Sequence, residues 1–589
     1  MEAATFRPLH SIRMTAETIV MSSAARRARA LGGFDVSLLV LAAAAVLLVL
    51  LIALPVGWLF YYALTDRTGA PTLANFIALA SDPALREPML TTLVLCFCVA
   101  IAAPSVASPL AWLVARTDLP ARRTIRALMT ASFVTPPFLG AIAWEILAAP
   151  NSGILNQAWR WATGAEGPLF DIYSMPGLVF VISCYTAPFT FVLVSNALDR
   201  IPADLEDAAG ILGAGRWRTV LTITLPLVVP AILAGALIAF LQAMTLFGSP
   251  AILALPAGFH TITTKIFALF QFPPKPQIAA AAALPLLVVT ILLLTAQSRL
   301  LGRRGYTVVG GKSSDPRLIR LGPLRIPALL LVLAILSLPL FLPYAALLKA
   351  AVSTYPGAPF AMDSVTLKHL RFVFLEFSQT QKAFWNTAIL ALGTATLGTL
   401  LALVIAYLTA RRAVVGSRVL EFLATAPIAI PGIVLGVGLF LSYARPPLAL
   451  YGTLWILLLA FLTIELPAAF QQLRSSFRAV HPELEEASRI LGAGRLKTLA
   501  RITAPLLKSG VVAAWCFVFI GVVRELSAAI MLFTSDTKVL SVVIYDLNES
   551  GDLGAIAVLG TAMLLVTFAV VGFANWISGV GSGVRLRGG

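Results

Sequence analysis

The pattern closest to a catalytic motif is a glycine-rich run near the middle of the chain. The run Gly305-x4-Gly310-Gly311-Lys312-Ser313 contains the residue types that cradle nucleotide phosphates. In a true phosphate-binding loop the lysine directly follows the second glycine, whereas here an extra glycine intervenes. The run also lacks a preceding strand pattern and a following helix pattern. We therefore expect no ATP binding in this chain.

Metal and redox chemistry are not favoured, because the residues they need are few and scattered. The four cysteines, Cys96, Cys98, Cys184 and Cys516, all fall in apolar stretches, where cysteine usually serves as a small packing residue. The four histidines form no set with ligand spacing. We predict no metal site, no cofactor and no enzymatic reaction.

The strongest pattern is a polar segment that occurs twice. Residues 205–226 read LEDAAGILGAGRWRTVLTITLP, and residues 484–505, which lie 279 positions later, read LEEASRILGAGRLKTLARITAP. Thirteen of the 22 positions are identical. Loops normally vary faster than the elements they connect, so a repeated loop indicates contact with a partner. The alternative is a solvated connection that keeps its symmetry by ancestry alone.

The elements that carry these two segments are predicted to be membrane spans. The chain is 59% hydrophobic and 12% charged, with a mean hydropathy of +0.91, whereas soluble domains carry about 25% charged residues. Twelve apolar stretches reach the roughly 20 residues that a bilayer-crossing helix needs. They lie near 37–60, 89–115, 127–149, 176–197, 227–247, 278–298, 326–350, 384–409, 421–442, 450–472, 509–532 and 556–580.

The net charge of +16 reflects topology rather than nucleic-acid binding. With the N-terminus inside, the inner segments hold 31 of the 43 Lys and Arg residues and the outer segments hold 10. This bias is typical of cytoplasmic loops and sets the orientation. Both termini and both copies of the repeated segment are then predicted to be cytoplasmic.

The spans divide into two halves of six. The motif at 111–116 matches the one at 406–411, and Pro188 matches Pro467. Because six is even, the halves share one orientation and form a parallel repeat. The predicted organisation is a cytoplasmic tail (1–36), a first half (37–298, loop 200–226), a linker (299–325), a second half (326–580, loop 473–508) and a tail (581–589).

Each repeated segment predicts a short helix, a glycine turn and a second helix on the cytoplasmic face. Acidic residues early in the first helix suit its N-terminal dipole. Gly213 and Gly492 are placed to end that helix in a left-handed turn. Ala208 and Ala487 leave a slim face that another surface can approach closely.

The segment resembles the EAA loop of ATP-binding-cassette importer permeases, whose pattern is E-A-A-x3-G-x9-I-x-L-P. The first copy matches with Asp207-Ala208-Ala209, Gly213, Ile223 and Leu225-Pro226, and the second with Glu486-Ala487-Ser488, Gly492, Ile502 and Ala504-Pro505. Asp207, Ser488 and Ala504 depart from the pattern, but neither glycine is lost. In that family the loop forms a coupling helix that sits in a cleft of the ATPase subunit. The resemblance implies ATPase coupling for Glu206, Asp207, Ala208, Ala209, Gly213, Glu485, Glu486, Ala487, Ser488 and Gly492.

The fused arrangement covers nearly the whole chain and resembles the ferric-iron class of binding-protein-dependent permeases. That class includes aminoethylphosphonate and thiamine relatives, and the segments 246–250 and 524–528 look like its signatures after the loop. The resemblance implies the type I importer fold, an all-α membrane protein. It also implies a bacterial inner-membrane location, two copies of a cytoplasmic ATPase subunit that use the ATP, and a periplasmic binding protein.

Charged or polar groups inside spans are candidates for the translocation path, because such groups are costly in lipid. They are Arg524, Glu525, Glu145, Glu465 and Gln242. Structural pairing between neighbouring helices is the alternative for each. Arg524 and Glu525 correspond to Thr245 and Leu246 in the first half, so the two halves differ there.

The function that these patterns predict is import of a solute through a permease subunit, with iron(III) as the first expectation by resemblance. Aminoethylphosphonate, thiamine and polyamine remain open as solutes. A secondary transporter also favours twelve spans, but it needs more intramembrane carboxylates and no paired docking loops. A membrane-embedded enzyme lacks a clustered set of His, Asp and Glu residues.

Overall fold

The computed structural model describes residues 36–303, 318–358, 362–410 and 417–578. Within these ranges ten helices are long and apolar enough to cross a membrane, and two sharply bent helix pairs bring the number to twelve. Extended segments in the same ranges form only isolated bridges. The all-α membrane fold is therefore confirmed. The glycine-rich run, most of both tails and the centre of the linker lie outside the described residues.

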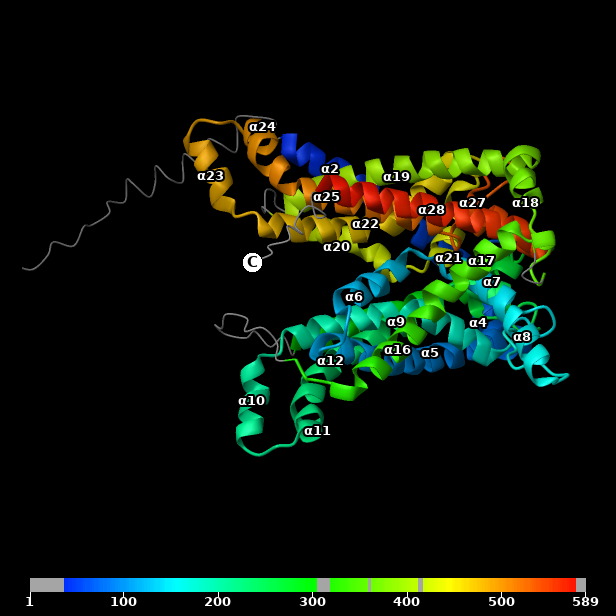
Figure 1. Ribbon diagram of the computed structural model, residues 1–589. Helices are drawn as coiled ribbons and strands as arrows, with labels where there is room; N and C mark the ends of the chain where they lie inside the picture. Colours follow the sequence, from blue (N-terminus) through cyan, green and yellow to red (C-terminus); the bar gives the residue numbers. More distant parts are fainter. Residues whose placement is uncertain (1–35, 304–317, 359–361, 411–416, 579–589) are drawn as a thin grey trace, which may run out of the picture.

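The two halves repeat the same order of helices, except that α8 has no counterpart among the described residues of the second half (Figure 1). The first half contains α2 (Val36–Leu48), α3 (Leu54–Ala63), α4 (Ala74–Ser81), α5 (Pro83–Arg116), α6 (Arg122–Ala131), α7 (Pro137–Ala148), α8 (Ile154–Thr163), α9 (Met175–Asp199), α10 (Ala203–Ile211), α11 (Arg216–Thr219), α12 (Leu225–Thr245), α13 (Gly248–Leu253), α14 (Ile262–Ala268) and α15 (Pro276–Arg303). The second contains α16 (Arg325–Leu336), α17 (Leu342–Val352), α18 (Lys368–Arg371), α19 (Ser378–Ala410), α20 (Ser417–Thr425), α21 (Gly432–Tyr443), α22 (Leu454–Ala479), α23 (Pro482–Ile490), α24 (Arg495–Thr498), α25 (Ala504–Arg524), α26 (Ala529–Leu532), α27 (Leu540–Glu549) and α28 (Leu553–Ser578).

A bundle of three long helices forms the core of each half. In the first half α5, α9 and α12 pack against one another, and in the second half α19, α22 and α25 do the same. Small residues allow this close approach, as expected of helices in lipid. A Cβ built on Gly235 of α12 would come within 2.6 Å of Oγ1 of Thr190 on α9. The bundles are therefore held together by close backbone packing.

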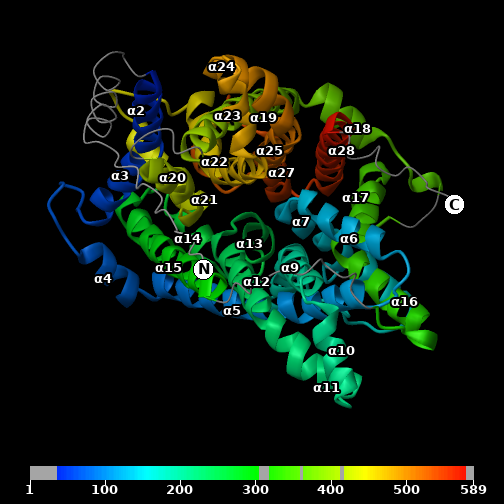
Figure 2. The ribbon, with the colours of Figure 1, turned by 90° about the vertical axis from the view of Figure 1, so that its left-hand side faces the viewer.

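The first span of each half packs partly on the other half. Figure 2 shows α2 and α3 beside α20 and α21, and α17 beside α7. α3 also contacts α15 of its own half, and α17 contacts α28. α3 approaches α21 closely at Gly438, where a Cβ would lie 2.9 Å from the carbonyl oxygen of Pro55. The two halves are thus interlocked through their first spans.

Four spans contain a π-helical turn that ends two residues before a proline. The turns are η1 (Val49–Ala53), η3 (Val220–Thr224), η5 (Ser337–Phe341) and η9 (Leu499–Thr503), and the prolines are Pro55, Pro226, Pro343 and Pro505. A proline inside a helix clashes with the carbonyl four residues earlier and donates no hydrogen bond. A wider turn relieves this conflict and keeps the span continuous. Pro226 and Pro505 thus lie within continuous helices rather than at span entrances.

Three predicted spans differ from the structure. Residues 127–149 and 421–442 are each a bent helix pair, α6 with α7 at 100° and α20 with α21 at 109°. The breaks precede Pro136 and Pro431, since a residue before proline avoids the helical conformation. The predicted span 509–532 is α25, which begins at Ala504 and ends at Arg524. The chain then turns into the short helix α26.

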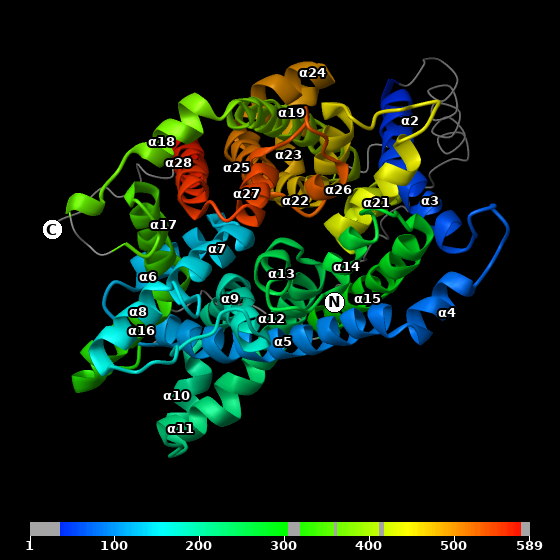
Figure 3. The same ribbon diagram turned by 90° about the vertical axis from the view of Figure 1, so that its right-hand side faces the viewer.

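The end of the molecule opposite α10 and α23 is filled by short helices from both halves. Figure 3 shows α13, α14, α26 and α27 near the centre of this end. Aromatic rings meet here across the halves, with Tyr545 of α27 at 5.8 Å from Phe247 and 6.3 Å from Phe267, measured between ring centroids. Non-helical backbone is tolerated at membrane depth where protein buries it. We call this region the short-helix end.

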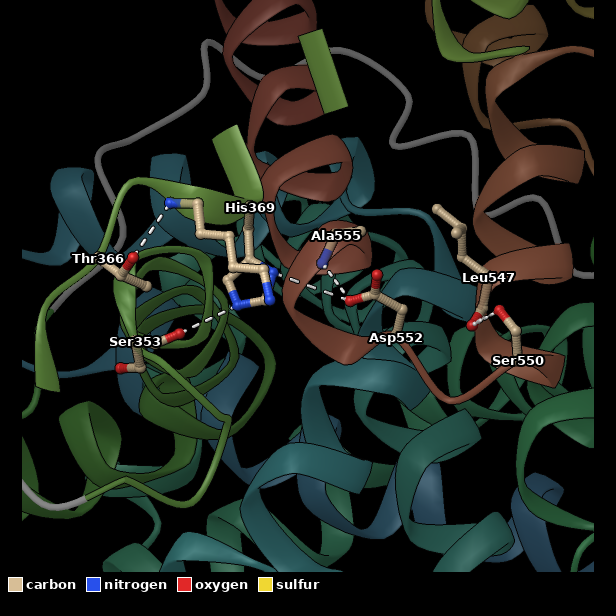
Figure 4. Close-up of polar contacts among 8 residues, drawn as sticks. Ser353, Thr366, His369, Leu547, Ser550, Asp552 and Ala555 are labelled. Atoms are coloured by element: carbon tan, nitrogen blue, oxygen red, sulfur yellow. Dashed lines mark hydrogen bonds and ion pairs between the residues drawn. The ribbon is translucent and has the colours of Figure 1, made fainter. Parts of the chain in front are cut away.

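At the same end of the molecule, His369 of α18 connects the end of α17 to the start of α28 (Figure 4). Nε2 of His369 donates to the carbonyl oxygen of Ser353 at 3.1 Å, and Nδ1 lies 3.9 Å from Oδ1 of Asp552. The corresponding residue of the first half, 294 positions earlier, is Asn75. Its side-chain amide donates to the carbonyl oxygens of Ala63 and Thr65 at 3.0 Å each. Both halves therefore use one polar side chain to hold the end of their first span.

The contact between Gly438 and Pro55 predicts a stability effect. We expect Gly438→Ala to lower the free energy of unfolding by about 1–3 kcal/mol, because a backbone carbonyl cannot rotate away from the new methyl group. The thermal midpoint of the detergent-solubilised chain measures this. Gly393→Ala on α19 is the control, since its Cβ would meet only Leu458 at an ordinary 3.6 Å. Equal midpoints for the two variants would refute the interlock.

Candidate functional site

The repeated segments form two helical hairpins that project from the same end of the molecule (Figure 1). The first arm is α10 in one copy and α23 in the other. The second arm, α11 or α24, runs through a π turn directly into α12 or α25. We predicted a separate second helix lying along the membrane face. The structure instead makes the second arm the start of a membrane span, so a force on the hairpin acts on that span.

Glycine is required at the bend of each hairpin. Gly213 and Gly492 have φ angles of +80° and +83°, a conformation that L side chains rarely adopt. In the first copy N–H of Gly213 donates to the carbonyl of Gly210, and N–H of Ala214 donates to that of Ala209. This pair of bonds is the Schellman motif that closes a helix C-terminus. The predicted left-handed turn is present in both copies.

Glu206 connects the first hairpin to itself and to the bundle. Its Oε1 accepts a hydrogen bond from Thr224 at 2.9 Å, which joins α10 to the second arm. The same oxygen lies 3.3 Å from Nη2 of Arg116, a guanidinium at the end of α5 whose side chain is only 1% exposed. Nε and Nη1 of Arg116 find no hydrogen-bond partner among the described residues, so Glu206 is its main charge partner.

The second hairpin contains the same connection. Oε1 of Glu485 accepts a hydrogen bond from Thr503 at 3.1 Å, and these two residues correspond to Glu206 and Thr224. Ser488 and Thr498 add a contact of 2.9 Å between their hydroxyl oxygens. The counterpart of Arg116 is Arg411, which lies outside the described residues. Glu485 and Ser488 are therefore buried groups that hold the two arms together.

The surface of each hairpin is apolar at its tip. Ile211 and Leu212 are both 87% exposed, and their counterparts Ile490 and Leu491 are 85% and 87% exposed. Trp217, on the second arm of the first copy, is 76% exposed. We call the two pairs of Ile and Leu the hairpin tips. Exposed apolar side chains that recur on a polar projection indicate a surface for a partner protein.

The predicted coupling residues fall into two groups. Ala208, Ala487 and Glu486 are exposed and Asp207 is half-buried, so they lie on or beside the accessible face. Glu206, Glu485, Ala209 and Ser488 face the hairpin interior or lie close to it. The sequence analysis missed the hairpin tips. The signal was available, because an identical Ile-Leu pair before Gly213 and Gly492 is unusual in a polar loop.

Glu145 has partners from both halves. Its Oε1 accepts a hydrogen bond from the Tyr173 hydroxyl at 2.7 Å, and its Oε2 accepts one from the side-chain amide of Asn548 at 3.1 Å. Asn548 belongs to α27 of the second half, so the contact crosses between the halves at the short-helix end. This arrangement fits the structural alternative for Glu145.

Three of the predicted path residues lie together in the second half. The Glu465 carboxylate on α22 lies directly against Gly521 of α25, three residues before Arg524 and four before Glu525. Nη1 of Arg524 also donates to the carbonyl oxygen of Phe133 in the first half at 2.5 Å. Oε1 of Glu525 accepts a hydrogen bond from N–H of Ala528 at 2.8 Å. We call Glu465, Arg524 and Glu525 the charged cluster.

The remaining path residue is apart from this cluster. Gln242 is half-buried on α12 of the first half. Within the described residues, no group of three or more His, Cys, Asp or Glu side chains could hold a metal ion.

Comparison with known proteins agrees with this architecture. A family model described as "binding-protein-dependent transport system inner membrane component" matches residues 107–305 and again residues 398–579. Each match contains one hairpin. The chain is 28% identical over 450 residues to a ferric transport system permease protein of Actinobacillus pleuropneumoniae, covering 76% of this chain and 64% of that protein. The match thus spans less than two thirds of that relative's length.

Two further similarities were found. An Fe(3+)-transport system permease protein of Haemophilus influenzae is 24% identical over 523 residues, which is 89% of this chain and 96% of that protein. A solved bacterial ABC transporter involved in the import of the acidic polysaccharide alginate is 18% identical, with a TM-score of 0.36 over 41% of this chain and 88% of that one.

The contact between Glu206 and Arg116 predicts a local change in hairpin stability. We expect Glu206→Ala to leave a buried guanidinium and the Thr224 hydroxyl unpaired, at a cost of about 1–3 kcal/mol. Hydrogen exchange of residues 203–224 should then accelerate while the long spans stay protected. Asp204→Ala removes an exposed acid from the same helix and is the control. Indistinguishable exchange in the two variants would show that Glu206 does not hold the hairpin.

Proposed function

Because this chain belongs to the family of binding-protein-dependent transport system inner membrane components, we propose that it is the translocation subunit of an ATP-driven importer. One chain supplies both halves of the permease. A binding protein delivers the solute to the outer end, and ATPase subunits bind the opposite, cytoplasmic end. ATP hydrolysis takes place on those subunits, and the permease itself catalyses no reaction.

The observation that carries this proposal is the pair of matching hairpins. They project from one end, have the same glycine bend, and expose the same apolar tips. Two equivalent docking elements on one chain suit two copies of one ATPase subunit. Each hairpin tip would enter a cleft of one copy, with Asp207, Ala208, Glu486 and Ala487 beside it.

The second arm of each hairpin is the connection through which an ATPase would move the membrane helices. α11 and η3 continue into α12, and α24 and η9 continue into α25. Glu206 and Glu485 fix the first arm to this continuous helix, so the hairpin moves as a unit. Arg116 extends the connection to α5 of the first bundle. Approach of the two ATPase copies would then rock the two bundles relative to each other.

The proposed cellular arrangement follows from charge and topology. The inner membrane of a bacterium is the expected location, with both termini and both hairpins in the cytoplasm. The excess of Lys and Arg in the segments on the hairpin side supports this orientation.

Iron(III) is the solute that we propose, because relatives from two organisms are named as ferric transport permeases. 2-Aminoethylphosphonate, thiamine and polyamine are the alternative solutes. The decisive experiment reconstitutes the permease with its ATPase and binding protein in proteoliposomes. ATP hydrolysis and solute uptake are measured with the binding protein loaded with each candidate in turn. We expect stimulation by the Fe(III)-loaded form, and stimulation by another form alone would reassign the solute.

If the hairpin tips bind the ATPase subunits, charged substitutions at the tips should prevent assembly of the complex. We expect Leu212→Asp together with Leu491→Asp to abolish binding of the ATPase subunits, because the charges would be buried without partners in an apolar cleft. Co-purification of the ATPase with the tagged permease measures the effect. Leu367→Asp is the matched control, since Leu367 is also exposed (67%) but lies near α18 at the opposite end. Normal co-purification of the double variant would contradict the docking assignment.

A further inference from the structure

A cavity lies between α22 and α25 of the second half. It has a volume of about 500 Å³ and is lined by Ala468, Gln471, Gln472, Ala513 and Phe517. Both glutamines are exposed, although they lie on a helix that is long and apolar enough to span the membrane. None of these five residues was among the predicted path residues.

The cavity adjoins the charged cluster along both helices. Ala468 follows Glu465 by three residues on α22, and Phe517 precedes Gly521 by four residues on α25, which is about one helical turn in each case. A Cβ on Gly521 would overlap the Glu465 carboxylate, so the acid lies directly against this glycine. The cavity, with its two glutamines, therefore lies directly beside the charged cluster.

This side of α25 faces the other half of the permease. Arg524 donates to the Phe133 carbonyl of the first half, which fixes the direction of that face of α25. Phe517 and Ala513 precede Arg524 by seven and eleven residues, or two and three turns, and so lie on the same face. The cavity consequently opens between the halves, where a solute would cross.

The first half offers no matching charge. The counterparts of Glu465, Arg524 and Glu525 at an offset of 279 are Thr186, Thr245 and Leu246. Those of the two cavity glutamines are Val192 and Leu193. We compared the first-half counterparts of the charged cluster, the two cavity glutamines and Gly521. Among them only Gln242, the counterpart of Gly521, has a large polar side chain. The charged cluster and the two glutamines are therefore a property of the second half.

We propose that this cavity and the charged cluster form a solute-holding site on the second half, and that its ligand is a cation that keeps water or other oxygen ligands. The volume lies within the range of about 300–1,000 Å³ that is typical of small-molecule sites and is far larger than a bare ion needs. Amide and carboxylate oxygens are the groups that hard cations and their hydration shells prefer. The carboxyl groups of Glu465 and Glu525 and the amides of Gln471 and Gln472 supply such oxygens here.

This inference rests on the proposed import function and is tested in the same reconstituted complex, with the binding protein loaded with radiolabelled Fe(III). We expect Gln472→Lys to reduce uptake at least about tenfold, because a fixed positive charge would repel a cation at short range. ATP hydrolysis stimulated by the binding protein should persist in this variant. Gln472→Glu should retain uptake, since it keeps an oxygen ligand. Leu193→Ala, at the first-half counterpart, is the control and should transport normally.

Two outcomes would overturn the inference while leaving the import function in place. One is normal uptake by Gln472→Lys. The other is loss of uptake in Gln472→Glu with uptake retained in Gln472→Lys, which would indicate an anionic ligand. Absence of any stimulated ATP hydrolysis in the unaltered complex would instead count against the proposed function.

A second measurement does not depend on transport. Gln472→Cys is made in a chain whose four native cysteines are changed to alanine, and it is treated with a charged, membrane-impermeant thiol reagent. Rapid labelling is expected if the cavity is open to water. Cysteine at Ile389, an exposed residue on the apolar helix α19, is the control and should stay unlabelled. Equal resistance of both positions would place Gln472 in lipid and refute the site.

Discussion

The structure depends on one constraint, which is that backbone polar groups in the hydrocarbon layer must be satisfied within the protein. This constraint explains why the spans are helices and why four of their prolines, Pro55, Pro226, Pro343 and Pro505, follow π turns within continuous spans. It also explains where irregular backbone occurs. α13 and α26 are short helices between non-helical segments, and both are buried where the halves meet. Protein packing there replaces the regular hydrogen bonding that lipid would demand.

The internal repeat produces two equivalent hairpins, and each hairpin is continuous with a membrane span. In each copy a glutamate is fixed to a threonine 18 residues later, so two short arms move as one body. The arms would be marginal as isolated helices because they are too short to be stable in water. Their stability comes from the buried acid and hydroxyl pairs and from continuity with a long span. A partner that grips the tips therefore acts on a rigid extension of α12 or α25.

The membrane interior departs from this symmetry. The charged cluster and the glutamine-lined cavity belong to the second half, whereas the corresponding positions of the first half are uncharged. Symmetric hairpins and an asymmetric interior are compatible, because the proposed ATPase contacts and the proposed solute contacts lie at different levels of the same helices. A single solute passing between two unlike surfaces needs polar groups on only one of them.

The sequence alone determined the membrane class, the twelve candidate spans, the two parallel halves and the glycine bends, because hydropathy, charge bias and left-handed glycine turns are local properties. It also identified the repeated segment, but it did not separate the buried Glu485 and Ser488 from the exposed Ala487 and Leu491. That distinction depends on how the two arms pack against each other, and residues adjacent in the sequence do not determine this packing. Tertiary structure likewise decided three further features. They are the 100° and 109° bends, the packing of each first span against the other half, and the cavity beside Glu465. They arise from contacts between residues far apart in the chain. The structural effect of a small side chain or a proline there depends on the surface against which it packs.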